Sequence, residues 1–430
     1  MKLTFIERTL LGDLKTWIDR REILAVKGPR QSGKTTLLKK LAEWLRDEKG
    51  VDEAHVVYVT LEDREQLDDM SQNSKDFVRR RLVDGGRHYL LLDEAQYLPE
   101  LGKRLKLVYD FFDNVKMVVT GSSSLELKRQ TGKFLVGRML EFELLPLSFF
   151  EFLRYKDRGL SRMYAEWNGR VVSLLTEGTR LDVKEAEDVF TRDLLVHLNE
   201  YSKFGGYPAV VLAREEEEKK KLLKGLISTY MDRDIVSFLQ ITDTIKFRNL
   251  MTALAATAGS MVKVDQLANE VGSYFKELTW LLDVLEQTYV IRRVRPFHRN
   301  LVTELKKAPK AYFVDAGLRN SLVDNFADLG RRADGGAMVE GFVANQLSSH
   351  VRTGYWRTTA KTEVDFVAHG RTVIPVEVKF QRFKRPEVSR SLGGFLRSYH
   401  PDRCLVVTRD FWGRRKVGET EVAYVPVGYL

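Results

Sequence analysis

The segment AVKGPRQSGKTTLLKKLAEWL, Ala25–Leu45, decides the fold of the amino-terminal part of this chain. It has the spacing G-x-x-x-x-G-K-T, with Gly28, Gly33, Lys34 and Thr35 at the specified positions. Glycines let the backbone curl until its N–H groups point at phosphate oxygens, the lysine reaches the β and γ phosphates, and the threonine hydroxyl ligates Mg²⁺. A strand-like run precedes the motif and an amphipathic helix follows it, as the motif requires. We therefore expect a site for ATP and Mg²⁺ made by Gly28, Pro29, Arg30, Gln31, Ser32, Gly33, Lys34, Thr35 and Thr36.

The run HYLLLDEAQYL, His88–Leu98, supplies the second half of this site. It reads as a buried strand that ends in Asp93, which can hold Mg²⁺, and Glu94, which can orient or deprotonate the attacking water. An acidic pair after a strand also serves as a helix N-cap. A further strand ends near Thr120 and Ser122, where a polar side chain can sense the γ-phosphate.

Composition places the chain among soluble globular proteins. Of its 430 residues, 43% are hydrophobic and 30% charged, and no apolar run approaches the roughly 18 residues that a membrane span needs. The first thirty residues lack the charge order of a signal peptide. The single cysteine, Cys404, excludes an internal disulfide and a Cys-based zinc cluster. We expect a cytoplasmic protein without a membrane partner.

Positive charge gathers toward the carboxyl terminus. The formal net charge is +10, and residues 331–430 hold 17 Lys and Arg against 10 Asp and Glu. Residues 290–310 hold seven Lys and Arg against one Glu. Clustered cations favour phosphate neutralisation by counterion release, and the alternative is a solvated basic surface.

Four stretches of the chain differ in their pattern of apolar and polar residues. Residues 1–160 alternate β-branched runs with helical patterns, which is typical of a parallel α/β sheet. Residues 161–240 are mostly helix-like, and we expect a helical lid or linker. Residues 241–329 predict a winged helix, and residues 330–430 predict a last α/β domain. The run GRRADGG, Gly330–Gly336, predicts a flexible linker into that domain.

The winged-helix prediction rests on the order of elements. FRNLMTALAATAG, VDQLANEVG and SYFKELTWLLDVLEQ show apolar spacing near 3.6, and YVIRRVRPFHRN follows as an extended basic arm. In a winged helix-turn-helix the third helix can enter a groove of DNA while the hairpin contacts phosphates. Winged helices also serve as protein-packing modules, so both uses stay open.

Near the carboxyl terminus, EVDFVAHGRTVIPVEVKF, Glu363–Phe380, predicts a second site. Asp365 lies in one short strand, while Glu377 and Lys379 lie two apart in the next and so face the same side. Two carboxylates and a lysine can hold a divalent metal and position water for attack on a phosphodiester. Glu340, in an upstream helix, can complete the cluster, with Mg²⁺ or Mn²⁺ as the metal. The alternative is an ordinary exposed hairpin.

The motifs GPRQSGKTTLLKKL, YLLLDEAQ, VTGSSSLELK, GRMLEFELLPLSFFEFL and FGGYPAVV resemble the AAA-type P-loop ATPases of archaea and bacteria that carry a winged helix and a carboxyl-terminal restriction-endonuclease-like domain. The resemblance covers nearly the whole chain. It implies that Arg138 acts on the nucleotide, in cis or across a subunit boundary, with a salt bridge as the alternative. It gives no physical reason for FGGYP, Phe204–Pro208.

The set Glu340, Asp365, Glu377 and Lys379 is similar to the catalytic core of the restriction-endonuclease-like fold, particularly that of archaeal Holliday-junction resolvases. Val364 takes the place of the proline often found before the first Asp of that fold. The resemblance implies a metal-dependent nuclease. A nuclease fold kept only as a binding or docking surface is the other reading.

The expected architecture is an α/β P-loop NTPase of AAA type with a helical lid, a winged helix and an α/β restriction-endonuclease-like domain. The leading hypothesis is an ATP-dependent DNA-processing enzyme that hydrolyses ATP, forms a homo-oligomer, and binds and cuts duplex or branched DNA. The competing hypothesis is a nucleotide-gated switch whose carboxyl-terminal domain binds DNA or a protein without cleaving anything. Glu377 separates the two, because only cleavage needs its carboxylate.

Overall fold

The computed structural model describes residues 5–121, 134–183, 189–238, 241–297 and 307–430, and the chain forms two compact units. Most of the expected winged helix and all of residues 330–430 lie in the same unit. None of the helices in the described ranges is long and apolar enough to cross a membrane. Unit 1 comprises Met1–Glu151, Tyr207–Leu212 and Asp283–Val290, and unit 2 comprises Phe152–Gly206, Ala213–Leu282 and Ile291–Leu430.

Unit 1 is built on a five-stranded sheet in the order β2-β3-β4-β1-β5, with every neighbouring pair parallel. Parallel strands end at the same edge, so the loops after β1, β3 and β4 meet there, which is where open α/β sheets bind ligands. The strands are β1 (Ile23–Lys27), β2 (Val56–Thr60), β3 (His88–Asp93), β4 (Val115–Gly121) and β5 (Met139–Glu143).

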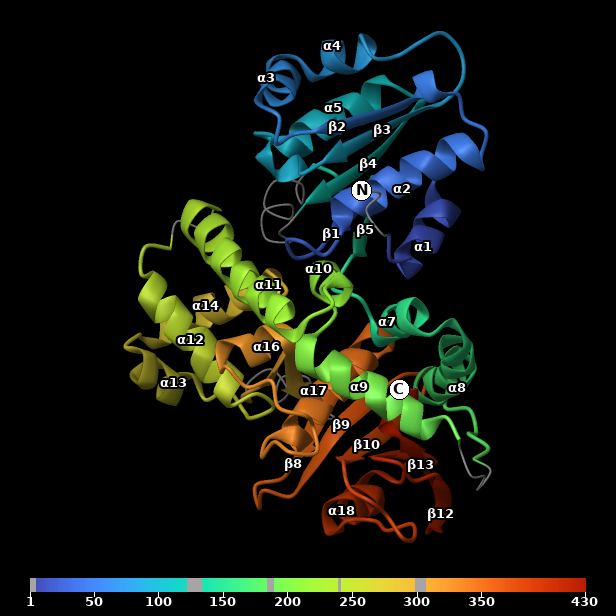
Figure 1. Cartoon of the computed structure of the whole chain (residues 1–430), viewed down its shortest axis with the longest axis vertical. Coiled ribbons are helices and arrows are strands. Elements are labelled where there is room, and N and C mark those ends of the chain that lie inside the picture. The colour runs from blue at the N-terminus through green and yellow to red at the C-terminus, as the bar shows by residue number, and fades with distance from the viewer. Residues whose placement is uncertain (1–4, 122–133, 184–188, 239–240, 298–306) are drawn as a thin grey trace. The chain divides into compact units, whose positions relative to one another are not determined.

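Helices cover both faces of this sheet (Figure 1). Successive strand residues point to opposite faces, so Leu24 and Val26 of β1 pack in one core cluster while Ile23 and Ala25 pack in the other. The first cluster takes its helical side chains from α1 and α2, and the second from α3, α4 and α5. The helices are α1 (Thr9–Trp17), α2 (Lys34–Asp47), α3 (Arg64–Gln72), α4 (Ser74–Arg79), α5 (Leu101–Phe111) and α10 (Pro208–Leu212).

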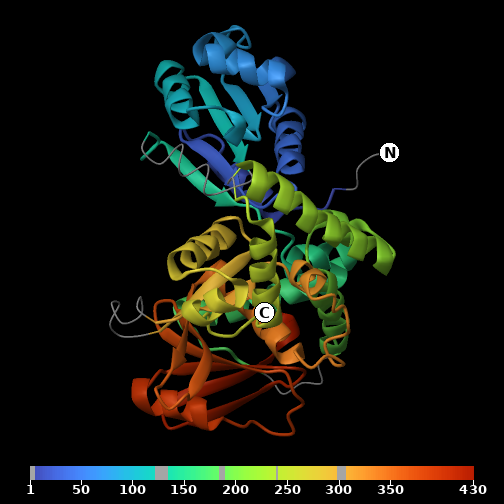
Figure 2. The ribbon, with the colours of Figure 1, turned by 90° about the vertical axis from the view of Figure 1, so that its left-hand side faces the viewer.

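Unit 2 contains a mixed eight-stranded sheet in the order β12-β13-β11-β10-β9-β8-β6-β7. Its strands from β8 onward are orange to red in Figures 1 and 2. Strands β8, β9 and β10 form an antiparallel meander, and β11 joins β10 in parallel after helix α18. The strands are β6 (Ile291–Pro296), β7 (Lys310–Phe313), β8 (Arg352–Arg357), β9 (Glu363–His369), β10 (Val373–Lys379), β11 (Arg403–Thr408), β12 (Gly413–Val417) and β13 (Thr420–Pro426).

Three helices precede the β6–β7 hairpin, and Met261, between the first two, pairs with Lys310 of β7. Strand β6 also pairs with β8, so the hairpin is continuous with the large sheet. The helices are α7 (Phe149–Lys156), α8 (Arg158–Glu177), α9 (Thr191–Phe204), α11 (Glu216–Thr229), α12 (Thr244–Ala256), α13 (Val264–Val271), α14 (Phe275–Gln287), α16 (Ala316–Leu322), α17 (Gly335–His350) and α18 (Arg390–Tyr399).

The flexible linker predicted at Gly330–Gly336 is wrong. Arg332 is buried, and its guanidinium binds the Asp334 carboxylate through Nε at 2.5 Å and Nη2 at 2.9 Å. Helix α17 then begins at Gly335. A bidentate arginine–carboxylate pair holds its two residues in one geometry, which a glycine-rich composition does not reveal.

The FGGYP segment has a packing reason. Gly205 has φ +76°, and a Cβ there would lie 2.2 Å from a carboxylate oxygen of Asp315. The Gly206 N–H donates to Asp315 Oδ2 at 2.7 Å, while Asp315 caps α16 by accepting from the Leu318 N–H at 2.8 Å. A Cβ at Gly317 would meet the Phe204 carbonyl oxygen at 2.0 Å. The glycines let the end of α9 touch the start of α16.

Candidate functional site

The phosphate loop lies where the sequence predicts it, between the carboxyl end of β1 and the start of α2. Gly28 fits only as glycine, because a Cβ there would lie 2.0 Å from the Leu144 carbonyl oxygen. Gly33 has φ +99° at the N-cap of α2, and Gln31 has φ +60°. Left-handed residues turn successive N–H groups toward one concave side, which is how such a loop receives an anion.

The loop's own side chains fit a bound phosphate chain. Lys34 is 4% exposed and its ammonium donates to the carbonyl oxygens of Gly28 and Pro29 at 3.0 and 2.9 Å. The Ser32 hydroxyl is buried and has no hydrogen-bond partner in the described part of the chain. Thr35 lies half-buried in the first turn of α2, beside the loop. A buried hydroxyl without a partner costs free energy that a ligand oxygen can recover.

Arg8 contacts the phosphate loop through its guanidinium, and no sequence motif predicted this role. It is 6% exposed, and its guanidinium donates to the Ser32 carbonyl at 2.7 Å and to the Leu145 carbonyl at 2.6 Å. Its Nε lies 3.2 Å from the Glu151 carboxylate, which also accepts from the Thr9 N–H at 2.7 Å. Arg8 therefore ties the loop to two distant segments and acts as a positioning residue.

The acidic pair lies at the end of β3, next to the loop's strand edge. The Asp93 carboxylate accepts hydrogen bonds from the hydroxyls of Thr120 and, at 2.9 Å, Tyr58. Burial, together with Asp93, raises the pKa of the Tyr58 phenol well above its usual value, so this hydroxyl stays a donor. Thr120 also accepts from the Glu94 N–H at 3.0 Å. Thr120 thus orients the acidic pair, while Ser122 lies outside the described residues.

Glu94 has φ +53°, and the Gln96 amide donates to its carboxylate. A non-glycine residue in the left-handed region costs free energy and is held there by its surroundings. These features and the loop's geometry fit ATP and Mg²⁺. Bound ATP would supply the phosphoanhydride to be cleaved, and Mg²⁺ would neutralise its charge.

Arg138 lies at the opposite edge of the sheet from the loop. Strand β5 runs parallel to β1, and the Arg138 carbonyl accepts from the Ile23 N–H at 2.8 Å, at the amino end of β1. The loop begins after Lys27, about 16 Å farther along the strand. The Arg138 guanidinium donates to Asp110 at 3.2 Å. A role at the nucleotide of its own subunit does not fit this placement.

In unit 2, Asp365, Glu377 and Lys379 lie together at neighbouring ends of β9 and β10. The Lys379 ammonium lies 3.1 Å from the Glu377 carboxylate, as expected for strand residues two apart. Asp365 accepts from the Val378 N–H at 2.7 Å. Burial and the nearby Glu340 carboxylate raise the pKa of Asp365 to about 7. Burial lowers the pKa of Lys379, but Glu377 and Asp365 outweigh it and leave the value raised.

Glu340 is held by two residues of β7, which the sequence did not indicate. Its carboxylate lies 2.9 Å from the buried Lys310 ammonium and accepts from the Tyr312 hydroxyl. Lys310 also pairs with Glu363 at 2.6 Å. Among the residues that the structure describes, no three His, Cys, Asp or Glu side chains form a group that could hold a metal ion. The predicted trio of Glu340, Asp365 and Glu377 is therefore not assembled as a metal site.

A groove of about 870 Å³ lies beside Lys379. It is lined by Phe380 and Arg382, which directly follow β10, and by Arg409, which follows β11. Arg192 of α9 lines its other side. Asp410 is the only acidic residue in this lining, and it pairs with Arg382 at 3.6 Å and Arg409 at 3.8 Å. The groove therefore has a net positive charge.

The loop after β1, the acidic pair after β3 and the parallel sheet define unit 1 as an AAA-type P-loop ATPase domain. In agreement, residues 20–153 match the family model described as AAA domain. Residues 195–329 and 335–427 match two models described only as domains of unknown function, DUF8612 and DUF4143.

Proteins described as uncharacterized are similar to this chain along most of its length. One from Haemophilus influenzae is 24% identical over 426 residues, which is 96% of each chain. One from Methanocaldococcus jannaschii is 25% identical over 379 residues, or 86% of this chain and 77% of that protein. Among solved structures, the ADP form of the Aeropyrum pernix ORC2 protein is 11% identical with a TM-score of 0.34, over 76% of this chain and 96% of that chain.

Proposed function

We propose that this chain uses ATP hydrolysis in unit 1 to act on DNA, duplex or branched, that unit 2 binds. The single observation that carries the proposal is the groove beside Lys379, lined by Arg192, Arg382 and Arg409. Arginine forks match phosphate oxygens, and neutralised phosphates release counterions, which drives binding.

In the nucleotide site each residue of the chain has a separate task. With ATP bound, Lys34 would reach the β and γ phosphates, and Thr35 and Asp93 would hold Mg²⁺, which would neutralise phosphate charge. Glu94 orients the attacking water and accepts its proton. The Thr120 hydroxyl keeps Asp93 and Glu94 in place. Removing this hydroxyl should therefore weaken both Mg²⁺ binding by Asp93 and activation of the attacking water by Glu94.

The helices that precede β6 contribute little to DNA binding in this proposal. Their order and the Met261–Lys310 pairing support a winged helix. However, α13 and α14 contain one cation, Lys276, and Phe275 and Trp280 are exposed on α14. Acidic residues outnumber cations on these two helices, so their surface repels phosphate. The acidic residues of these two helices are Asp265, Glu270, Glu277, Asp283 and Glu286.

The test is binding of the purified full chain to labelled linear, forked and four-way-junction DNA, with and without ATP. The double variant Arg382→Ala/Arg409→Ala should lose most of the binding, while its ATP hydrolysis without DNA persists. Equal binding by the variant and the wild type would overturn the proposed groove.

Cleavage of the bound DNA is the second candidate, favoured by the shared face of Asp365, Glu377 and Lys379. The helix α17, the β8–β10 meander, α18 and the parallel β11 support a restriction-endonuclease-like core. Since Glu340 is paired with Lys310, a metal site would first require this pair to separate. Cutting with Mg²⁺ or Mn²⁺ that Glu377→Ala abolishes would establish cleavage. Binding without cutting in both proteins would leave the nucleotide-gated switch.

We include a homo-oligomer in this proposal, because Arg138, if it acts on a nucleotide, must act on that of another subunit. Mixing Lys34→Ala subunits with Arg138→Ala subunits should then restore part of the ATPase activity, because some interfaces combine an intact loop with an intact arginine. A mixture no more active than its parts would assign Arg138 to its salt bridge with Asp110.

A further inference from the structure

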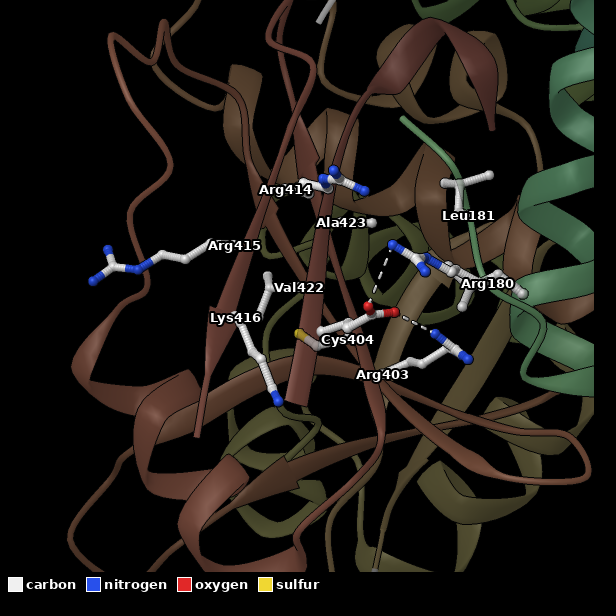
Figure 3. Close-up of a pocket in the computed structure, with 11 residues that line it drawn as sticks. Arg180, Leu181, Arg403, Cys404, Arg414, Arg415, Lys416, Val422 and Ala423 are labelled. Atoms are coloured by element: carbon white, nitrogen blue, oxygen red, sulfur yellow. Dashed lines mark hydrogen bonds and ion pairs between the residues drawn. The ribbon is translucent and has the colours of Figure 1, made fainter. Parts of the chain in front are cut away.

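A cavity of about 250 Å³ opens in unit 2 beside strands β11, β12 and β13 (Figure 3). Five of its lining residues are cations, against one carboxylate, Glu421, which gives the lining a formal charge of +4. Like charges gathered at one place repel, so the surplus favours an anion there. The five cations are Arg180, Arg403, Arg414, Arg415 and Lys416.

The cavity is separate from the groove beside Lys379. Strands β10 and β11 are parallel, and Lys379 pairs with Thr408 at the carboxyl end of β11. The cavity instead includes Arg403 and Cys404, at the amino end of the same strand. The two ends of β11 are about 16 Å apart, so one small ligand cannot occupy both places.

Part of the positive charge is already neutralised. The Arg403 guanidinium binds the Glu421 carboxylate at 2.6 Å and donates to the Gly178 carbonyl at 2.7 Å. Arg180 approaches the same carboxylate at 3.7 Å and Asp182 at 3.3 Å. Glu421 thus fixes the two arginines at one wall of the cavity, and both still have N–H groups available because a guanidinium has five donors.

Arg414 supplies the charge that nothing in the described chain offsets. It has no ion pair or hydrogen bond with any described residue. Its neighbour Arg415 extends to the other side of β12 in Figure 3, where it donates to the Pro386 carbonyl at 3.1 Å. Lys416, two residues from Arg414, pairs with the exposed Glu419 at 3.1 Å. Alternation along the strand thus separates Arg414 from Arg415.

The rest of the lining is apolar. Leu174, Leu181 and Val422 are buried, and so is Cys404. Burial, followed by Glu377, raises the pKa of the Cys404 thiol, so it is a protonated, apolar part of the wall. A few convergent cations above an apolar floor are typical of a site for a small anion with a less polar body.

We propose that this cavity binds a phosphate group, with Arg414 as the residue that contacts it and the Arg180–Glu421–Arg403 set as its supporting wall. Arginine forms two parallel charge-assisted hydrogen bonds to phosphate, and Arg414 keeps its donors for that purpose. The phosphate can belong to a free nucleotide or to the end of a nucleic-acid strand, because the chemistry of recognition is the same.

The test measures binding by calorimetry to the full chain carrying Lys34→Ala, which weakens competing binding at the nucleotide loop. The probes are inorganic phosphate, a nucleoside monophosphate and a short 5′-phosphorylated single strand. Adding Arg414→Ala should weaken binding of the preferred probe about tenfold or more. Arg415→Ala, with the same charge change one residue away, should weaken it less than about twofold.

Each outcome decides a separate point. Preference for the monophosphate identifies a free nucleotide as the source of the phosphate, and preference for the strand identifies a nucleic-acid end. Equal losses from the two arginine variants, or no binding of any probe before they are added, would overturn the site. Binding of long DNA in the Arg382 and Arg409 groove is measured apart from this, so failure here leaves the proposed function standing.

Discussion

The nucleotide site and the nuclease-like site treat their charged side chains differently. In the first, the Lys34 ammonium donates to two backbone carbonyls, and the Asp93 carboxylate accepts from two hydroxyls. In the second, Glu340 is paired with Lys310, and Glu377 with Lys379. Neutral groups contact Lys34 and Asp93 in the first site, whereas lysines of the chain pair with the carboxylates of the second.

This difference indicates what each site requires from outside. Neutral supports hold a charged side chain in place without satisfying its charge, and a ligand of opposite charge completes the set. A carboxylate that already has a buried lysine is satisfied, and an added cation must displace that lysine. A metal at the second site must therefore displace a lysine that the chain itself supplies.

The largest effect should come from removing the Lys34 ammonium. Lys34→Ala should lower ATP hydrolysis about a thousandfold, because the charge on the transferring phosphoryl group loses its main stabilising donor. Steady-state phosphate release measures it. Lys40→Ala, on the same helix but paired with Glu43, is the matched control and should keep its activity. Comparable losses in the two variants would contradict the role of Lys34.

The next effect tests the built-in counterion. Lys310→Met should destabilise unit 2 by about 4 kcal/mol, because Glu340 and Glu363 lose their buried partner. Mn²⁺ should then recover part of the loss by binding the freed carboxylates, whereas wild type without nucleotide should gain little. Thermal unfolding with and without Mn²⁺ measures both.

Lys307→Met, an exposed lysine three residues earlier, is the control and should behave as wild type. If Mn²⁺ fails to raise the unfolding temperature of Lys310→Met, the Lys310 ammonium does not occupy the position of a metal ion. The proposed difference between the nucleotide site and the nuclease-like site would then be wrong.

The same contrast explains how far the sequence could predict each site. The loop from Gly28 to Thr36 is one continuous segment, and the backbone conformation requires its glycines. Its place between β1 and α2 therefore follows from the motif. Asp93 and Glu94 follow from the strand before them. Arg8 could not be predicted, because its contacts with Ser32 and Leu145 bridge distant segments without a periodic signal.

The second site depends on more distant parts of the chain. The i, i+2 rule predicted that Glu377 and Lys379 meet, and they do. Lys310 and Tyr312 lie on β7, and only the sheet order brings that strand near α17. Because Lys310 and Tyr312 hold Glu340, the predicted metal trio is not assembled. The sequence pattern identifies residues of the right type but does not reveal which residues they contact.

A third carboxylate, Asp315, is buried and accepts from backbone N–H groups, and no cation among the described residues pairs with it. Burial raises its pKa to about 6, although N–H groups of Gly206, Leu318 and Gly317 lower it in part. The folded chain therefore holds a proton that the unfolded chain loses near pH 4. The stability this proton contributes is present below about pH 4 and is lost as pH rises through 6, a change of about 3 kcal/mol.

Asp315→Asn should remove this pH dependence while one amide oxygen still caps α16. Urea unfolding between pH 4 and 8 measures the difference between wild type and variant, which should change in favour of the variant as pH rises. The exposed Asp324→Asn is the control. A constant difference across this range would mean that the Asp315 carboxylate is not protonated when the chain folds.

The smallest effect concerns cations that are partly satisfied, as in the groove beside Lys379. Arg382 and Arg409 share Asp410 at 3.6 and 3.8 Å, distances that leave much of their charge available to phosphate. Each single change to alanine should weaken DNA binding several-fold and lower the slope of log affinity against log salt by about one. Arg371→Ala, at the other end of β10 and paired with Glu177, should leave both unchanged. Asp410 already neutralises part of the charge of Arg382 and Arg409. An unchanged salt slope in the single variants would therefore mean that the two arginines pair with Asp410 and not with DNA.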